Sequence, residues 1–145
     1  MAAPCQVDFY VLAGAAQSAQ RLACRLAMKA WEQGFTVSVR TEDDRQAKAL
    51  DELMWDYPPG RFLPHGAGSE GAASPVNIGT DQQDIPADRD VIINLAASAV
   101  PEPARFRRLL EIVPSEAAQR DASRNKYRQY REQGLDPAHH TIGKS

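Results

Sequence analysis

Cationic side chains gather near the C-terminal end of the chain, where their spacing could bind an anion. Between residues 120 and 131 the sequence has five cations and one anion, although the whole chain carries a net charge of −2. At about 100° per residue, a helix would place four side chains within roughly 60° of one another: Arg120, Arg124, Tyr127 and Arg131. The chemistry that this predicts is non-covalent. Guanidinium groups pair with carboxylate or phosphate, and the ring offers an apolar contact.

This basic stripe (Arg120, Arg124, Tyr127 and Arg131) has two interpretations. A run of charged residues is often a solvated helix face without a partner. The stripe has a single sign, however, and it lacks the Glu–Lys spacing of a self-paired surface helix. We therefore favour a binding face over a solvated one.

A glycine pattern, Gly66-Ala67-Gly68-Ser69-Glu70-Gly71, resembles a dinucleotide fingerprint. In such a site the glycines lie between the first strand and a helix whose N-terminus faces the pyrophosphate. Here Pro75 argues against a helix after the loop, and Glu70 puts a negative charge where the phosphates would lie. The pattern therefore indicates a surface loop more strongly than a cofactor site.

Other side chains with possible chemistry are also explained more simply. The acidic residues 42–44 could hold Mg²⁺, but acids in a first helical turn also stabilise the helix dipole. His65 is alone, and His139-His140 lacks further ligands nearby. We find no nucleophile elbow and no Ser/His/Asp set. The sequence therefore predicts no catalytic residue, no metal and no cofactor.

The basic stripe needs a helix to position it, and the sequence predicts one from Ser115 to about Gly134. Ser115 is a natural N-cap, and Gly134 is typical of the position just past a helix end. Upstream, strands are predicted at 7–12, 35–39, 90–95 and 109–113, with helices at 18–33 and 41–57. Minor strands could form at 61–65 and 76–79, and a short helix at 101–108.

Alternating strands and helices with short links are typical of a parallel α/β sheet with right-handed crossovers. The strand at 90–95 is the most apolar, and we expect it in the centre of the sheet, buried on both faces. We predict a single domain over residues 1–134 and a loosely ordered tail over 135–145, which has little to pack. Cys24 is expected to be a buried free thiol.

The composition is that of an ordinary soluble protein, with 43% hydrophobic and 25% charged residues. No segment has the length of a membrane span, and no signal-peptide pattern is present, so we expect a cytoplasmic protein without membrane contact. Two large aromatics near helix ends and loops, Trp55 and Phe62, could be core residues or interface anchors. Their spacing alone does not decide between these roles.

Several short segments, taken in order, resemble the chi subunit family of the bacterial DNA polymerase III holoenzyme, an accessory component of the clamp-loader complex. The matching segments are Phe9–Leu12, Glu42–Asp43, Leu50–Trp55, Phe62–His65 with the glycine-rich loop after it, Asp90–Leu95, Val113–Pro114, and Lys126–Tyr130 leading to Gly134. Together they span nearly the whole chain. No single segment is a strict signature, but their order and spacing are specific.

The resemblance implies a three-layer, Rossmann-like, mostly parallel sheet flanked by helices, with no nucleotide site. It also implies a non-catalytic subunit in DNA replication that bridges two partners. One partner is the psi subunit of the clamp loader, with Phe62 at a matching contact position. The other is the acidic, Pro-Phe-ending tail of single-stranded DNA-binding protein. The positions matching its site are Val113, Arg120, Arg124 and Tyr127, with Trp55 nearby.

Two departures from the family pattern stand out: Arg120 lies where the family can carry Lys, which changes the donor geometry, and residues 136–145 match poorly. Two other functions compete with the bridging role. The arginines could bind single-stranded nucleic acid directly through its phosphates, or the loop at 66–71 could serve a small nucleotide-dependent enzyme. The resemblance favours the bridging role, with mainly indirect contact to nucleic acid.

Overall fold

One parallel sheet forms the centre of the computed structural model, which describes residues 5–13, 18–56, 63–67, 74–82, 85–86 and 88–142. The strand order is β3-β4-β2-β5-β6-β1-β7, and every recorded pairing is parallel. The elements are β1 (Gln6–Leu12), α1 (Ala19–Glu32), β2 (Val37–Thr41), α2 (Asp44–Asp56), β3 (His65–Ala67), β4 (Val76–Thr80), β5 (Val91–Asn94), the short 3-10 helix η2 (Pro103–Arg105), β6 (Arg108–Val113), α3 (Ala117–Glu132) and β7 (Ala138–Ile142).

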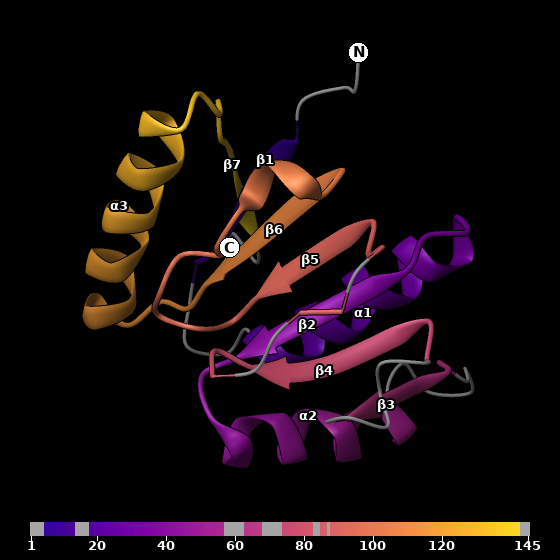
Figure 1. Ribbon diagram of the computed structural model, residues 1–145. Helices are drawn as coiled ribbons and strands as arrows, with labels where there is room; N and C mark the ends of the chain where they lie inside the picture. Colours follow the sequence, from indigo (N-terminus) through magenta and orange to yellow (C-terminus); the bar gives the residue numbers. More distant parts are fainter. Residues whose placement is uncertain are drawn as a thin grey trace.

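Helices cover both faces of the sheet, with α1 and α2 on one side and α3 on the other (Figure 1). The alternation of side chains along each strand divides the core accordingly. Leu12 and Ile93 pack in the cluster that contains residues of α1 and α2. Phe9 and Ile92 pack in the cluster that contains Tyr130 of α3. The predicted single-domain, three-layer α/β fold with a Rossmann-like sheet is confirmed.

The apolar segment predicted as the central strand is β5, the fourth of the seven strands in the sheet. All four of its residues are buried, with Val91 and Ile93 facing one core cluster and Ile92 facing the other. Burial on both faces explains why its sequence is a continuous apolar run rather than an alternating one. Upstream, β2 begins two residues later than predicted, and the segment at 76–79 is a full member of the sheet, β4.

Helix α3 ends as its sequence predicted but begins differently. Gly134 has φ 86°, and its N–H donates to the Arg131 carbonyl at 3.0 Å, while the Leu135 N–H reaches the Tyr130 carbonyl at 3.0 Å. These two bonds form a Schellman ending, which requires a left-handed residue such as glycine. The N-cap is Glu116 rather than Ser115, and it makes no side-chain capping bond.

The C-terminal segment differs from the loosely ordered tail expected for residues 135–145. Residues 138–142 form β7, which pairs in parallel with β1 from Asp8↔Ala138 to Leu12↔Ile142. The tail has few aliphatic side chains, but backbone hydrogen bonds and two stacked imidazoles hold it in place. The rings of His139 and His140 lie 5.1 Å from those of Phe9 and Tyr10. The sheet therefore extends beyond residue 134.

A buried carboxylate links the three strands at this edge of the sheet. Asp8 of β1 is 1% exposed and accepts hydrogen bonds from Arg108 Nη2 of β6 and His140 Nε2 of β7, each at 2.8 Å. Burial by itself would raise the pKa of Asp8, but the hydrogen bonds from His140 and Arg108 outweigh it, and the pKa lies below its ordinary value. The carboxylate therefore stays ionised and ties β7 to the sheet.

The remaining sequence predictions concern chemistry rather than architecture. Cys24 is a buried free thiol, as predicted, and burial raises its pKa to about 12. Gly66 lies in β3, at the sheet edge remote from β1, so the glycine pattern does not follow the first strand; its residues 68–71 lie outside the described part. Within that part, no helix is long and apolar enough to cross a bilayer, and no cluster of side chains suits a metal ion.

Candidate functional site

The orientation of α3 is set by two of its side chains that point into the core. Lys126 and Tyr130 are buried against Glu111 of β6. Lys126 Nζ donates to Glu111 Oε1 at 2.9 Å and to the Ala96 carbonyl at 2.5 Å, and the Tyr130 hydroxyl donates to Glu111 Oε2 at 2.5 Å. Lys126, one of the five cations counted in the sequence, is therefore engaged inside the protein.

This Glu111 cluster (Glu111, Lys126, Tyr130 and Asn94) joins α3 to the centre of the sheet. Asn94 Nδ2 of β5 donates to Glu111 Oε2 at 2.8 Å, and the Val100 N–H donates to the Tyr130 hydroxyl at 2.9 Å. Burial, and next the negative charge of Glu111, raise the pKa of Tyr130, so its hydroxyl remains a neutral donor. Because buried polar groups need partners, the cluster holds α3 in one rotation, with the opposite face outward.

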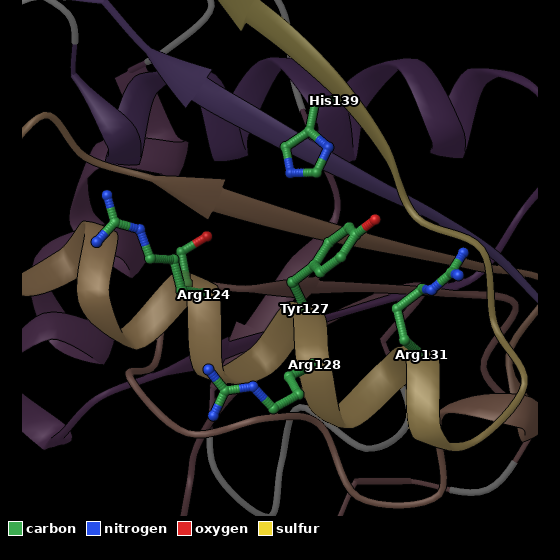
Figure 2. A pocket seen from close by; sticks show the side chains of 6 residues that line it. Arg124, Tyr127, Arg128, Arg131 and His139 are labelled. Carbon is green, nitrogen blue, oxygen red and sulfur yellow. The ribbon is translucent and has the colours of Figure 1, made fainter.

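A hollow of about 590 Å³ lies between the outward side of α3 and strand β7. Its lining residues are Ser123, Arg124, Tyr127, Arg128, Arg131 and His139. Figure 2 shows Tyr127 pointing from α3 toward His139, with Arg124 and Arg131 on either side of it along the helix. The Tyr127 ring lies 5.3 Å from the His139 ring and 6.1 Å from Phe9. We call this the α3–β7 hollow.

The cations of the hollow are weakly paired within the protein. Arg124 contacts Asp121 at 3.3 Å, with both side chains more than 70% exposed. Arg131 contacts Asp136 at 2.9 Å, also at the surface. Exposed ion pairs of this kind contribute about 1 kcal/mol or less. The guanidinium groups can therefore exchange these partners for the carboxylates of a ligand.

Three of the residues predicted for this site lie in or beneath the α3–β7 hollow. Arg124 and Tyr127 line it. Val113, at the end of β6, is buried in the core cluster against which Tyr127 packs. Arg120 is exposed on α3 one turn before Arg124 and is not among the lining residues. It extends the cationic surface beyond the hollow.

Trp55, which we expected near the basic stripe, lies elsewhere. It is on α2, is 58% exposed, and its ring lies 4.8 Å from that of His65 on β3. Strands β3 and β7 are the two edges of the sheet, six strand spacings or roughly 29 Å apart. At this distance Trp55 cannot join Tyr127 in one small site. The expectation was wrong because sequence spacing does not indicate which edge of the sheet each ring lies against.

Phe62 lies outside the described residues, which resume at Leu63. Leu63 is fully buried. The ring of His65 makes hydrogen-bond contacts through Nδ1 to the Leu63 carbonyl at 2.7 Å and through Nε2 to the Asp51 carbonyl of α2 at 3.2 Å. The chain just after Phe62 is thus held against α2, on the side of the molecule that carries Trp55.

Three residues that line the hollow, Ser123, Arg128 and His139, were not predicted from the sequence. Arg128 lies further round the helix than the basic stripe, so helical spacing predicts a smaller role for it, yet it lines the hollow together with Arg124. His139 was considered only as a metal ligand in a loose tail. No pattern of spacing could have found it, because 12 positions of chain separate it from Tyr127 and only the pairing of β7 with β1 brings the two rings together.

Comparison with known proteins links the chain to one family. The model described as DNA polymerase III chi subunit, HolC, matches residues 5–138. A relative from Pseudomonas aeruginosa named DNA polymerase III subunit chi is 40% identical over 139 residues, which cover 94% of this chain and 96% of the relative. The Escherichia coli protein of the same name is 32% identical over 119 residues, or 81% of each chain. That of Haemophilus influenzae is 28% identical over 139 residues, covering 94% and 96%.

Solved structures with a similar fold come from proteins of very different sequence. The crystal structure of T4 UvsW has a TM-score of 0.64 at 7% identity, over 94% of this chain and 41% of its own. Saccharomyces cerevisiae Dbp5 bound to RNA and ADP BeF3 has a TM-score of 0.60 at 11% identity, over 97% and 42%. This chain thus spans about two fifths of those proteins, and at such identities the likeness concerns the fold alone.

Proposed function

Because the chain belongs to the DNA polymerase III chi subunit family, we propose that it is a non-catalytic accessory subunit that bridges two partners during DNA replication in the cytoplasm. One partner is the acidic, Pro-Phe-ending tail of single-stranded DNA-binding protein. The other is the psi subunit, which would connect the chain to the clamp loader. The expected family resemblance is confirmed by the match over residues 5–138; the two partners are our proposal.

The α3–β7 hollow is the observation that carries the first half of this proposal. An acidic tail with a terminal aromatic ring needs cations for its carboxylates and an apolar seat for its ring. Arg124, Arg128 and Arg131 provide the cations, and Tyr127, supported by Phe9, provides the seat. Arg120 extends the cationic surface along α3, so an extended peptide could continue past the hollow.

We place the psi-subunit surface at the opposite edge of the sheet. The family pattern assigns Phe62 to this surface. We add Trp55 to it, because the Trp55 ring packs on His65, which lies three positions after Phe62 in the sequence. An exposed tryptophan is a typical interface anchor. Surfaces at opposite edges would allow both partners to bind at the same time, as a bridge requires.

The proposal is tested by titrating the purified protein with two ligands: an acidic peptide ending in Pro-Phe, and a single-stranded oligonucleotide. Tighter binding of the peptide is expected, because the hollow offers an apolar seat as well as cations. The main alternative is direct nucleic-acid binding, in which the same arginines contact phosphates. Tighter binding of the oligonucleotide would favour that alternative and count against the bridging role.

Phe62→Ala is expected to weaken binding of the psi subunit by about tenfold or more, because aromatic anchors dominate interface energies. Binding of the acidic peptide should be unchanged, since we place the two surfaces at opposite edges of the sheet. Calorimetry with each partner measures both effects, and circular dichroism checks the fold. Arg124→Ala serves as the reciprocal control. An unfolded variant would make Phe62 a core residue, and an equal loss of both partners would contradict separate surfaces.

A further inference from the structure

Among the residues that the structure describes, His139 is the one lining residue of the α3–β7 hollow that does not come from α3. It lies on β7, beside His140, and alternation along the strand sends the two rings to opposite faces of the sheet. His140 lies over Tyr10 and bonds to Asp8. His139 stacks on Phe9 with an interplanar angle of 19° and a centroid distance of 5.1 Å, and it tilts against Tyr127.

The two other histidines use their nitrogens within the protein, whereas His139 does not. His65 contacts two backbone carbonyls, and His140 contacts the Asp8 carboxylate. Within the described part of the chain, the imidazole of His139 makes ring contacts but no hydrogen bond or ion pair. Its side chain is exposed at the hollow. An N–H of this ring is therefore available to a bound ligand.

The described charged residues that line the hollow beside His139 are all cationic. From α3 it meets Arg124, Arg128 and Arg131 as fellow lining residues, and Tyr127 as a ring. From β1 it meets Phe9, which has no charge. On its own strand, His140 faces Asp8 on the other side of the sheet. The nearby carboxylate of Asp136 is held by Arg131 at 2.9 Å. None of the described lining residues is acidic, so a ligand would supply the counter-ion.

We propose that His139 is a binding residue of the hollow whose imidazolium donates a hydrogen bond to a carboxylate of the acidic peptide. Peptide binding then takes up a proton from solvent, and affinity rises as the pH falls from 8 toward 6, the range in which histidine changes its charge. The stacked rings of Phe9, His139 and Tyr127 also form the apolar seat for the terminal aromatic ring. This inference rests on the proposed function of the hollow.

The test is calorimetry of the acidic Pro-Phe peptide against the full chain at pH 8.0 and pH 5.8, at constant ionic strength. The peptide is N-acetylated, because a free α-amino group would also titrate in this range, whereas peptide carboxylates and arginines keep their charges. A pH effect that the His139 variant loses then reports on that histidine. The wild type should bind about 3- to 10-fold more tightly at the lower pH, as a charge-assisted hydrogen bond at a partly exposed site would give. His139→Gln, which can donate a hydrogen bond but cannot titrate, should reduce this ratio to about twofold or less.

His140→Gln is the matched control: the same substitution on the next residue of β7, at the other face. It should keep the pH dependence of the wild type. Repeating the titrations in buffers of different ionisation enthalpy counts the protons taken up, and His139→Gln should take up fewer. If circular dichroism shows that His139→Gln is unfolded, His139→Phe keeps the stacked ring without a proton and should also lose the pH dependence.

Different results would contradict the proposed function of the hollow and the proposed role of His139. A wild-type protein that binds the peptide at neither pH would overturn the proposed function of the hollow. A wild-type protein that binds, with a pH ratio and proton uptake equal to those of the folded His139 variant, would overturn the role of His139 alone. A pH dependence lost in His140→Gln but kept in His139→Gln would assign the effect to the other face of β7.

Discussion

Lys126→Met is expected to lower the free energy of unfolding by about 3–5 kcal/mol, the usual effect of removing one partner from a buried ion pair. The change leaves the Glu111 carboxylate without its counter-ion at a site that is closed to solvent. It also removes the donor to the Ala96 carbonyl. Methionine fills a similar volume, so the loss reports on charge and hydrogen bonding more than on packing. Urea unfolding, followed by circular dichroism, measures the change.

Two further variants test whether the loss of stability comes from the buried charge: a surface lysine control and a double variant. Lys29→Met removes an exposed lysine from α1 and should change stability by under about 0.5 kcal/mol. Adding Glu111→Met to Lys126→Met removes the stranded charge and should recover part of the loss, because an apolar pair of similar volume is often tolerated. A Lys126→Met protein as stable as the Lys29 control would contradict the role assigned to the Glu111 cluster in orienting α3.

Arg124→Ala is expected to weaken binding of the acidic Pro-Phe peptide by about 10- to 100-fold, or about 1.5–3 kcal/mol, if the guanidinium meets a partly desolvated carboxylate. Arg124 lines the hollow beside Tyr127, and its own partner, Asp121, is exposed. The variant should fold normally, because the side chain is 77% exposed. Calorimetry measures the affinity, and the wild-type affinity should also fall as salt screens the charges.

Other arginines give a graded control for this experiment. Arg120 lies outside the hollow, so Arg120→Ala should cost less than tenfold in affinity, as an exposed charge does. Arg128 lines the hollow, so Arg128→Ala should weaken peptide binding more than Arg120→Ala does. Arg25→Ala removes an exposed charge from α1, on the other face of the sheet, and should have no effect. A folded Arg124→Ala protein that binds the peptide like wild type would remove the basis of the proposed site.

Much of the fold could be predicted from local patterns, because those patterns reflect forces that act within one element. The apolar run at 90–95 identified a strand buried on both faces, and it is the central strand β5. Gly134 identified the end of α3, because only a left-handed residue makes that turn at low cost. Helical spacing also showed that Arg124, Tyr127 and Arg131 share one face, which is the face that lines the hollow.

Tertiary structure alone decided which distant residues meet. Counting charges could not show that Lys126 points inward, because this depends on Glu111 lying beneath it on β6. Strand pairing brought His139 to Tyr127, and strand order put Trp55 at the other edge of the sheet. Periodicity determines which side chains share a face of their own element. Which element lies against that face depends on burial and pairing summed over the whole chain, and these carry no local signal in the sequence.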